Sequence, residues 1–318
     1  MPSSWYDAFV LNALVILLAV ALDLLLPEPP AIVHPVVWMG KAISAFERVA
    51  PAGPVAGLFF GCVVVIVIVG ILGGIAWLAM AALSAVGPAA YVIGGAVILR
   101  TSFTVRGLVS AADRTRTALE GGHFDEARES LKSLVSRDAE GLSASLVAAA
   151  AIESVAENTT DSFVAPWLGF AVFGVPGAVA FRAINTLDSM VGTRGRYEYF
   201  GKTAARLDDA VNLIPARLSA LLILVSGGLG RHSLARGWRT MMRDRHLTAS
   251  PNAGWTMGAM AGLLGVRLEK PGHYCLGEGL REPETEDIGK SMAMAKQTAA
   301  LGVVAILIVL AARHAIFG

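Results

Sequence analysis

Charged residues are scarce in this chain of 318 residues. Asp, Glu, Lys and Arg make up 16% of it, whereas a soluble domain usually holds about a quarter. The formal net charge of +1 leaves no basic field for nucleic acid, so no nucleic-acid partner is expected. The two cysteines, Cys62 and Cys275, lie far apart, one in an apolar block and one in a polar stretch. This excludes a cysteine-based zinc site and argues against a disulfide framework.

Apolar residues are abundant and occur in long blocks. They make up 55% of the chain, and the mean hydropathy is +0.61. A membrane-spanning helix needs roughly 20 mostly apolar residues. We therefore predict an all-α, multi-pass integral membrane protein that forms a single membrane domain over residues 1–318. The predicted membrane or re-entrant helices are 9–26, 55–86, 89–103, 163–183 (interrupted by Gly174 and Pro176), 211–229 and 299–312.

Two polar stretches separate these blocks. Residues 105–141 are charged with helical spacing and predict a soluble helical hairpin, and residues 230–296 predict a polar or amphipathic segment. Lysine and arginine concentrate in cytoplasmic loops of membrane proteins. The basic residues of the hairpin are Arg106, Arg114, Arg116, Arg128, Lys132 and Arg137. With an outside N-terminus, the hairpin and the active site are expected on the cytoplasmic side of the cell (inner or plasma) membrane.

Three carboxylates lie between apolar segments. Glu153, Glu157 and Asp161 are spaced i, i+4 and i+8, which would stack them on one face of a helix. Like charges at this spacing repel each other, and no Lys or Arg lies among them. A divalent cation, a cationic substrate or a distant arginine is needed to compensate, and oxygen ligands suit Mg²⁺. The alternative is a solvated polar face.

A further stretch interleaves acidic and basic residues. Asn185 and Asp188 share a helical face, and Asp208 and Asp209 follow among several arginines. A site for phosphate and metal requires this mixture, because arginine binds phosphate oxygens in bidentate fashion. The alternative is a cytoplasmic basic loop, which accounts for some of these arginines.

Several strings, in this order, resemble the CbiB-type (also called CobD-type) cobalamin-biosynthesis family, adenosylcobinamide-phosphate synthase. The resemblance extends from Asp23 to about Arg267 and is highly specific. It departs from the expected pattern at Thr193 and Ser162. The strings are Asp23 with Pro29-Pro30 and His34-Pro35, Glu153-Ser-Val-Ala-Glu157-Asn158-Thr, Asn185-Thr-Leu-Asp188-Ser189-Met, Ala205-Arg206-Leu-Asp208-Asp209, Pro215-Ala-Arg217-Leu and Ser250-Pro-Asn252-Ala-Gly254-Trp255.

The resemblance implies an acid–amine ligase that consumes ATP and depends on Mg²⁺. It implies that the free propionate of adenosylcobyric acid, a corrinoid, is joined to (R)-1-amino-2-propanol or its phosphate ester. The product would be adenosylcobinamide or its phosphate. The expected partners are these substrates, the lipid bilayer and other membrane-associated enzymes of cobalamin assembly.

Residue type and motif position give the candidate roles. The expected catalytic residues are Glu153, Glu157, Asp188, Asp208 and His34. The expected metal ligands are Glu157, Asp161, Asp188, Asp208 and Asp209. Substrate and phosphate binding is expected from Lys41, Arg137, Arg182, Arg206, Arg217, Asn158, Asn185 and Asn252. These side chains are expected to converge in one pocket at the cytoplasmic edge of the bilayer.

The alternative function is a polytopic transporter of a polar solute, in which intramembrane carboxylates carry ions. Repeats with matching broken helices would support it, and the sequence has none. A membrane alcohol phosphotransferase would also bind Mg²⁺ through aspartates. Its spaced aspartate signature does not occur in the sequence.

Overall fold

The computed structural model describes residues 5–27, 30, 32, 35–134, 141–192 and 198–317. Three helical stretches there are long and apolar enough to cross a membrane: Pro54–Val86, the kinked run Ala144–Val191, and Thr285–Ile316. A further candidate is the pair Glu198–Val211 and Leu213–Leu229, bent by 48° at its junction. The shorter helices Phe9–Leu25 and Pro88–Arg100 are also apolar. These helices confirm the predicted all-α, multi-pass membrane architecture.

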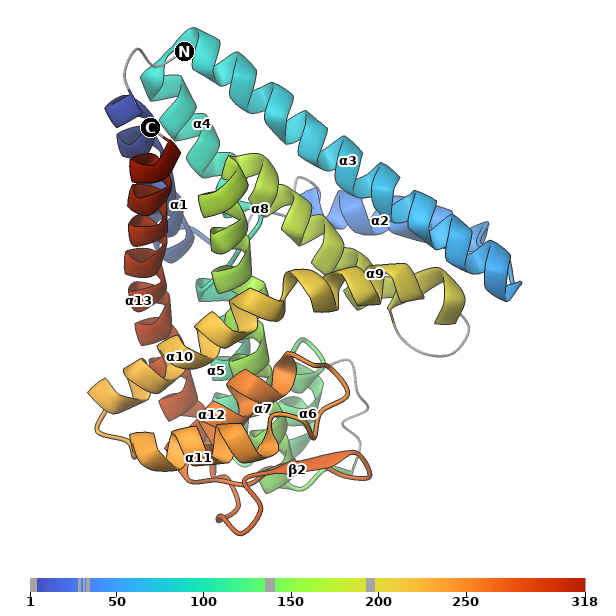
Figure 1. The fold of residues 1–318 in the computed structure, drawn as a ribbon. Coiled ribbons are helices and arrows are strands. Elements are labelled where there is room, and N and C mark those ends of the chain that lie inside the picture. The colour runs from blue at the N-terminus through green and yellow to red at the C-terminus, as the bar shows by residue number, and fades with distance from the viewer. Residues whose placement is uncertain are drawn as a thin grey trace. The chain divides into compact units, whose positions relative to one another are not determined.

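Contacts divide the chain into two compact units. Unit 1 comprises Met1–Thr104, Ala165–Val211 and Val303–Gly318, and unit 2 comprises Val105–Val164 and Asn212–Gly302. The helices of unit 1 are α1 (Trp5–Leu25), α2 (Pro35–Arg48), α3 (Pro54–Val86), α4 (Pro88–Arg100), α8 (Ala165–Val191), α9 (Glu198–Val211) and the end of α13 (Thr285–Phe317) (Figure 1).

Proline and glycine set the ends of the helices in unit 1. Pro54 and Pro88 occupy first positions of α3 and α4, where a missing N–H leaves no helical bond unmade. Gly87 joins the two helices at a φ of 144°, which glycine adopts without strain. Inside α8, Gly174 leaves the helical conformation at a φ of 71°, two residues before Pro176. The chain therefore turns and kinks where these residues occur.

Glycines also bring α9 against α3 and α8. A side chain at Gly61 would overlap the backbone carbonyl of Phe200, and one at Gly201 would overlap the carbonyl of Val191. Gly57, one turn before Gly61, faces Tyr199. Small residues four apart let helices approach closely. The beginning of α9 is thereby fixed against the end of α8.

Unit 2 is mostly helical, with one short hairpin of strands among its described residues. The elements are α5 (Arg106–Glu120), α6 (Phe124–Leu131), α7 (Ala144–Thr159), the π-helix η1 (Thr160–Val164), α10 (Leu213–Leu229), α11 (Leu234–Asp244), α12 (Ala253–Leu264), β1 (Leu268–Lys270), β2 (Tyr274–Leu276) and the beginning of α13. The strands pair antiparallel, with Glu269 opposite Cys275. The polar segment 230–296 thus contains two helices, this hairpin and the first turns of α13.

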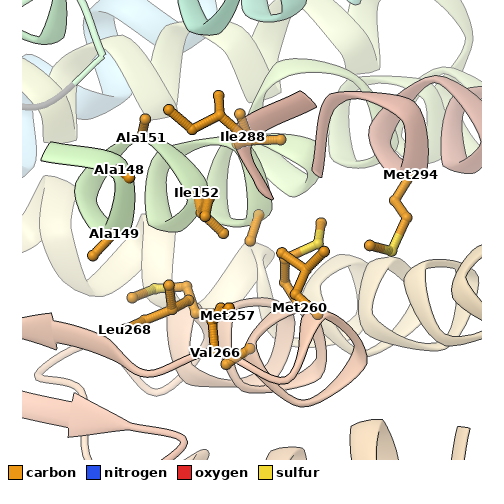
Figure 2. Packing of buried hydrophobic residues seen from close by; sticks show 14 of the residues in the cluster. Ala148, Ala149, Ala151, Ile152, Met257, Met260, Val266, Leu268, Ile288 and Met294 are labelled. Atoms are coloured by element: carbon orange, nitrogen blue, oxygen red, sulfur yellow. The ribbon is translucent and has the colours of Figure 1, made fainter. Parts of the chain in front are cut away.

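Helix α7 lies in the apolar core of unit 2. Every residue from 147 to 156 is buried. Alanine dominates this stretch, and its small side chain lets neighbours approach from all sides. Figure 2 shows Ala148, Ala149, Ala151 and Ile152 of α7 among Met257, Met260, Val266, Leu268, Ile288 and Met294. Glu153, on the same helix, is also buried and is 4% exposed.

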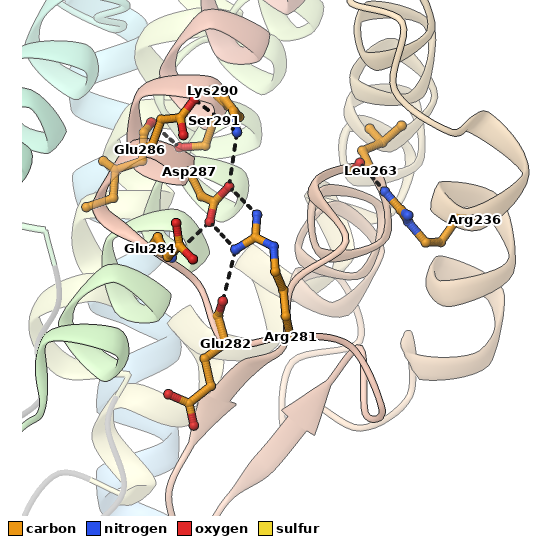
Figure 3. A network of polar contacts seen from close by, with 10 residues as sticks. Arg236, Leu263, Arg281, Glu282, Glu284, Glu286, Asp287, Lys290 and Ser291 are labelled. Atoms are coloured by element: carbon orange, nitrogen blue, oxygen red, sulfur yellow. Dashed lines mark hydrogen bonds and ion pairs between the residues drawn. The ribbon is translucent and has the colours of Figure 1, made fainter.

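A polar network fixes the beginning of α13. Arg281 donates to both oxygens of the Asp287 carboxylate at 2.7 Å, and the Glu284 backbone N–H donates to Oδ2 at 2.9 Å (Figure 3). A carboxylate in the first turn that accepts from the residue before the helix satisfies an otherwise unpaired donor. In the same figure Arg236 of α11 donates to the carbonyl of Leu263 at the end of α12, at 3.1 Å.

Candidate functional site

The predicted site residues fall into two sets, one in each unit. The set in unit 1 consists of Lys41, Arg182, Asn185, Asp188, Arg206, Asp208 and Asp209. Helix α8 contacts both α2, which carries Lys41, and α9, which carries the last three. Asn185 and Asp208 are each 8% exposed, whereas Lys41 and Arg206 are on the surface. Asp208 is therefore more buried than Lys41 and Arg206.

One face of α8 presents three of these residues. Arg182, Asn185 and Asp188 follow at intervals of one turn, and Nη1 of Arg182 lies 3.5 Å from Oδ1 of Asn185. Gly192 comes one turn later, and a side chain there would overlap the Asp188 carboxylate. The missing side chain thus leaves room for Asp188 at the end of α8. Gly201 meets the same helix end, and Asp208 lies about two turns further along α9.

The set in unit 2 begins with the carboxylates of α7 and η1. Glu153 is buried, Glu157 is exposed and Asp161 is partly buried. The π-helix η1 begins at Thr160 and interrupts the repeat of 3.6 residues between Glu157 and Asp161. The three carboxylates therefore differ in exposure, and their common helical face stays a prediction. Short π-helices are frequent at functional sites.

Asn158 makes contacts within its own helix. Its Nδ2 donates to the backbone oxygen and to Oγ of Ser154, both at 3.0 Å. Oγ of Ser154 in turn donates to the carbonyl of Leu134 at 2.8 Å. These bonds tie the end of α7 to the segment after α6. Asn158 thus helps to fix the end of α7.

Arg217 and Asn252 are brought together from positions 35 residues apart. Arg217 is in the first turns of α10, and Asn252 immediately precedes α12. Nη1 of Arg217 donates to Oδ1 of Asn252 at 2.6 Å and to the carbonyl of Leu213 at 2.9 Å. Asn252 is 7% exposed. The amide thereby holds the guanidinium at the N-terminal end of both helices.

Two residues that the sequence analysis did not assign complete this cluster. The guanidinium of Arg217 lies 4.7 Å from the centre of the Trp255 ring, and that of Arg245 lies 4.9 Å from it. A cation within about 6 Å of an indole face is attracted by the ring quadrupole. We call Arg217, Arg245, Asn252 and Trp255 the arginine–tryptophan cluster.

The turn before α12 shapes this cluster. Oγ of Ser250 accepts the backbone N–H of Asn252 at 3.2 Å. A side chain at Gly254 would overlap the carbonyl of Arg245, so glycine allows α12 to begin directly against the end of α11. In the sequence, Trp255 is indicated only by its place in the family string Ser250-Pro-Asn252-Ala-Gly254-Trp255. Arg245 precedes that string and was not distinguished from the other arginines of α11.

Two predicted residues, His34 and Arg137, lie outside the described residues. The others belong to either unit 1 or unit 2, so their convergence in one pocket stays a prediction. Within the described part of the chain, three or more His, Cys, Asp or Glu side chains never come together as a metal-binding group would require. Mg²⁺ often takes only one or two carboxylates, with water and substrate phosphates completing its shell. One or two of the hard oxygen donors Asp188, Asp208 and Asp209 would fit this kind of coordination.

Comparison with known proteins decides the family. A model of the family described as CobD/Cbib protein matches residues 16–304, nearly the whole chain. The chain belongs to the CobD/CbiB family. This confirms the resemblance inferred from the sequence strings.

Curated relatives of the family agree with this assignment. The chain is 46% identical over 282 residues to the cobalamin biosynthesis protein CobD of Dehalococcoides mccartyi, covering 88% of this chain and 92% of that protein. It is 41% identical over 274 residues to the CobD protein of Geobacter metallireducens, covering 86% of each. It is 34% identical over 285 residues to that of Klebsiella pneumoniae, covering 86% of this chain and 89% of that protein. No solved structure gives a significant match. Family membership assigns the chain to cobalamin biosynthesis.

Proposed function

We propose that this CobD/CbiB family member forms the amide bond between the free propionate of adenosylcobyric acid and (R)-1-amino-2-propanol or its O-phosphate. The match over residues 16–304 carries the proposal, because it includes both sets of site residues. The membrane helices and the acidic and basic groups on α7 to α12 are consistent with it.

The chemistry requires an activated carboxyl group, because a carboxylate does not accept an amine near neutral pH. The propionate oxygen attacks the γ-phosphorus of ATP, so that an acyl phosphate forms and ADP leaves. The amine nitrogen then attacks the acyl carbon, the C–N bond forms, and inorganic phosphate leaves. The proton lost by the ammonium group passes to a base, for which Glu153, Glu157 and His34 are the candidates.

The cations and carboxylates have complementary tasks in this scheme. Arg182, Arg206, Arg217, Arg137 and Lys41 would bind phosphoryl oxygens and the corrinoid carboxylate. Asn158, Asn185 and Asn252 would orient them or hydrogen-bond to the corrinoid amides. Mg²⁺ would be held by one or two of the carboxylates of Glu157, Asp161, Asp188, Asp208 and Asp209, and when bound it neutralises charge on the transferring phosphoryl group.

Purified protein in detergent tests the reaction directly. Adenosylcobyric acid, Mg²⁺ and ATP are incubated with aminopropanol or its phosphate in separate reactions, and the amide is detected by mass spectrometry. We expect one amine to give an ATP-dependent product. Formation of neither amide by protein that binds the corrinoid would overturn the proposal.

Asp208→Glu tests the carboxylate assignment. The charge is kept but the oxygens move by one methylene, so kcat should fall by about tenfold or more. The matched control is Asp113→Glu, at a carboxylate on α5 that pairs with Arg116 at 2.7 Å and is 47% exposed. The kcat of Asp113→Glu should equal that of the wild type. Wild-type turnover in Asp208→Glu would remove this residue from the machinery.

A deletion strain separates the ligase from the transporter. Cobinamide supplied in the medium lies after the proposed step and should restore cobalamin, whereas cobyric acid should not. Rescue by both compounds would contradict the ligase.

A further inference from the structure

The arginine–tryptophan cluster places two like charges on one aromatic ring. Arg217 comes from α10 and Arg245 from the end of α11, and both guanidinium groups lie within 5 Å of the centre of the Trp255 ring, at 4.7 and 4.9 Å. All three side chains are partly buried. Two cations that share one ring repel each other, and this repulsion grows as water is excluded.

Carboxylates do not neutralise these arginines. Among the residues that the structure describes, neither Arg217 nor Arg245 forms an ion pair, whereas Arg243, two residues before Arg245, pairs with Asp244 at 2.6 Å. Thus Arg243, in the last turn of α11, is neutralised, whereas Arg245, directly after the helix, lacks a carboxylate partner in the described part of the chain. The cluster therefore favours an anion from outside the chain.

The geometry also leaves donors available for that anion. Nη1 of Arg217 is used by Leu213 and Asn252, and Nη1 of Arg245 is used by Met242. Within the described ranges, Nε and Nη2 of both arginines have no hydrogen-bond acceptor. Nε and Nη2 form the edge of a guanidinium that binds two oxygens of one anion. Two such edges supply four donors.

Stacking and hydrogen bonding fix these donors before a ligand arrives. Trp255 restrains both guanidinium planes, and the buried amide of Asn252 orients Arg217. Arginine held on an aromatic face loses little freedom on binding. A tetrahedral dianion with three terminal oxygens matches two cations and four donors better than a carboxylate, which has two oxygens and one charge.

We infer that Arg217, Arg245, Asn252 and Trp255 form a binding subsite for a phosphoryl group. Two sources share this chemistry, the phosphate monoester of an amino alcohol and the phosphates of ATP. The choice between them rests on the proposed function, whereas the affinity for a phosphoryl group does not. Trp255 and Arg245 thus become ligand-binding residues, and Asn252 becomes a positioning residue for Arg217.

Fluorine NMR of the full chain labelled with 5-fluorotryptophan tests this inference. Trp255 is one of six tryptophans, and its signal is identified as the one missing from Trp255→Phe. The probes are inorganic phosphate, O-phosphoethanolamine, ethanolamine, MgATP and adenosine. We expect a saturable shift of the Trp255 signal with phosphorylated probes and none with ethanolamine or adenosine. Tighter binding of O-phosphoethanolamine than of MgATP assigns the subsite to the amine substrate, and the reverse order assigns it to the nucleotide.

Charge variants complete the test. Arg217→Gln and Arg245→Gln should each weaken phosphate binding by about tenfold or more, and Arg245→Lys should recover only part of the loss because lysine lacks the fork. The control is Arg239→Gln, at an exposed arginine on α11 whose Nε donates to Ala235 at 3.0 Å. Unchanged signals of the other tryptophans establish that each variant is folded.

Two results would overturn the subsite: a Trp255 signal that stays unmoved by every phosphorylated probe, or equal weakening by Arg239→Gln and Arg245→Gln. A saturable shift in protein that forms no amide would reject the proposed ligase and keep the subsite. Amide formation without a shift of the Trp255 signal would reject the subsite and keep the proposed ligase.

Discussion

The thiol of Cys275 on β2 is held in its neutral form by its surroundings. It is partly buried, and Glu269 lies directly opposite it on β1. Burial raises the pKa of the Cys275 thiol, the Glu269 carboxylate raises it further, and Arg267 lowers it. Because the thiolate is the reactive species, this cysteine should react slowly near neutral pH.

Alkylation of Cys275 as a function of pH measures this effect. In a Cys62→Ser background, the rate with iodoacetamide should reach half its maximum at a higher pH than for an ordinary cysteine. Glu269→Gln removes a negative charge, so the pKa should fall and alkylation at pH 8 should become faster. Glu282→Gln serves as control, because Glu282 contacts the same Arg267 at 3.1 Å. Identical pH profiles for wild type and Glu269→Gln would show that this carboxylate does not act on the thiol.

Residue type and motif position identified Arg217 and Asn252 separately, but not their hydrogen bond. That bond joins the beginnings of α10 and α12, and helical periodicity relates only residues on the same helix. Arg245 was missed for a related reason. Its difference from Arg243 lies in the missing carboxylate partner, which depends on how α11 ends against Gly254.

Helices α11 and α12 approach closely through glycines. Gly254, Gly258 and Gly262 recur every four residues on α12. The position for a side chain on Gly258 lies 3.1 Å from Cα of Met241, and that on Gly262 lies 2.8 Å from Cα of Gly237. Small residues at this spacing allow backbones to touch. This contact holds Arg245 and Trp255 at a fixed separation.

Gly262→Ala should force α11 and α12 apart. Overpacking of this kind costs about 1–3 kcal/mol, so the midpoint of thermal unfolding in detergent should fall. The control is Gly74→Ala in α3, where no described atom lies within 4 Å of the added methyl group. There alanine should be neutral or stabilising by about 0.5–1 kcal/mol, because it restricts the unfolded helix segment. An equal shift in both variants would show that the helix contact is not tight.

Apolar blocks and helix breakers predict some elements better than others. The helices around residues 55–86 and 89–103 follow from hydropathy and from Gly87-Pro88, and the kink at Gly174 follows from the nearby Pro176. The π-helix η1 cannot be predicted in this way, because no distinctive residue marks the change from the α-helical to the π-helical hydrogen-bond pattern. The first turns of α13 are polar and depend on the Asp287 network, so hydropathy alone does not reveal their continuity with the apolar part.

At the scale of the whole molecule, hydropathy identifies apolar helices but does not fix how often the chain crosses the bilayer. Residues 144–191 form one helical run that kinks at Gly174, and α7 at its beginning is buried in the core of unit 2. A buried alanine-rich helix and a membrane span look alike in composition. Orientation depends on a different signal, the lysines and arginines of the loops.

Labelling of single cysteines tests the predicted orientation. In a Cys62→Ser/Cys275→Ser background, Glu126→Cys introduces a thiol into the hairpin, at a side chain that is 75% exposed. Lysine and arginine favour the cytoplasmic side of a membrane, and Asp and Glu have little influence on orientation. Five described cations lie in this hairpin, at Arg106, Arg114, Arg116, Arg128 and Lys132. A membrane-impermeant maleimide should therefore label Glu126→Cys in inverted vesicles and not in intact cells. Ala89→Cys, at the beginning of α4, should show the opposite pattern, because one further crossing separates it from the hairpin. Labelling of Glu126→Cys in intact cells would place the hairpin outside, away from cytoplasmic ATP, and would contradict both the orientation and the ATP-dependent ligase.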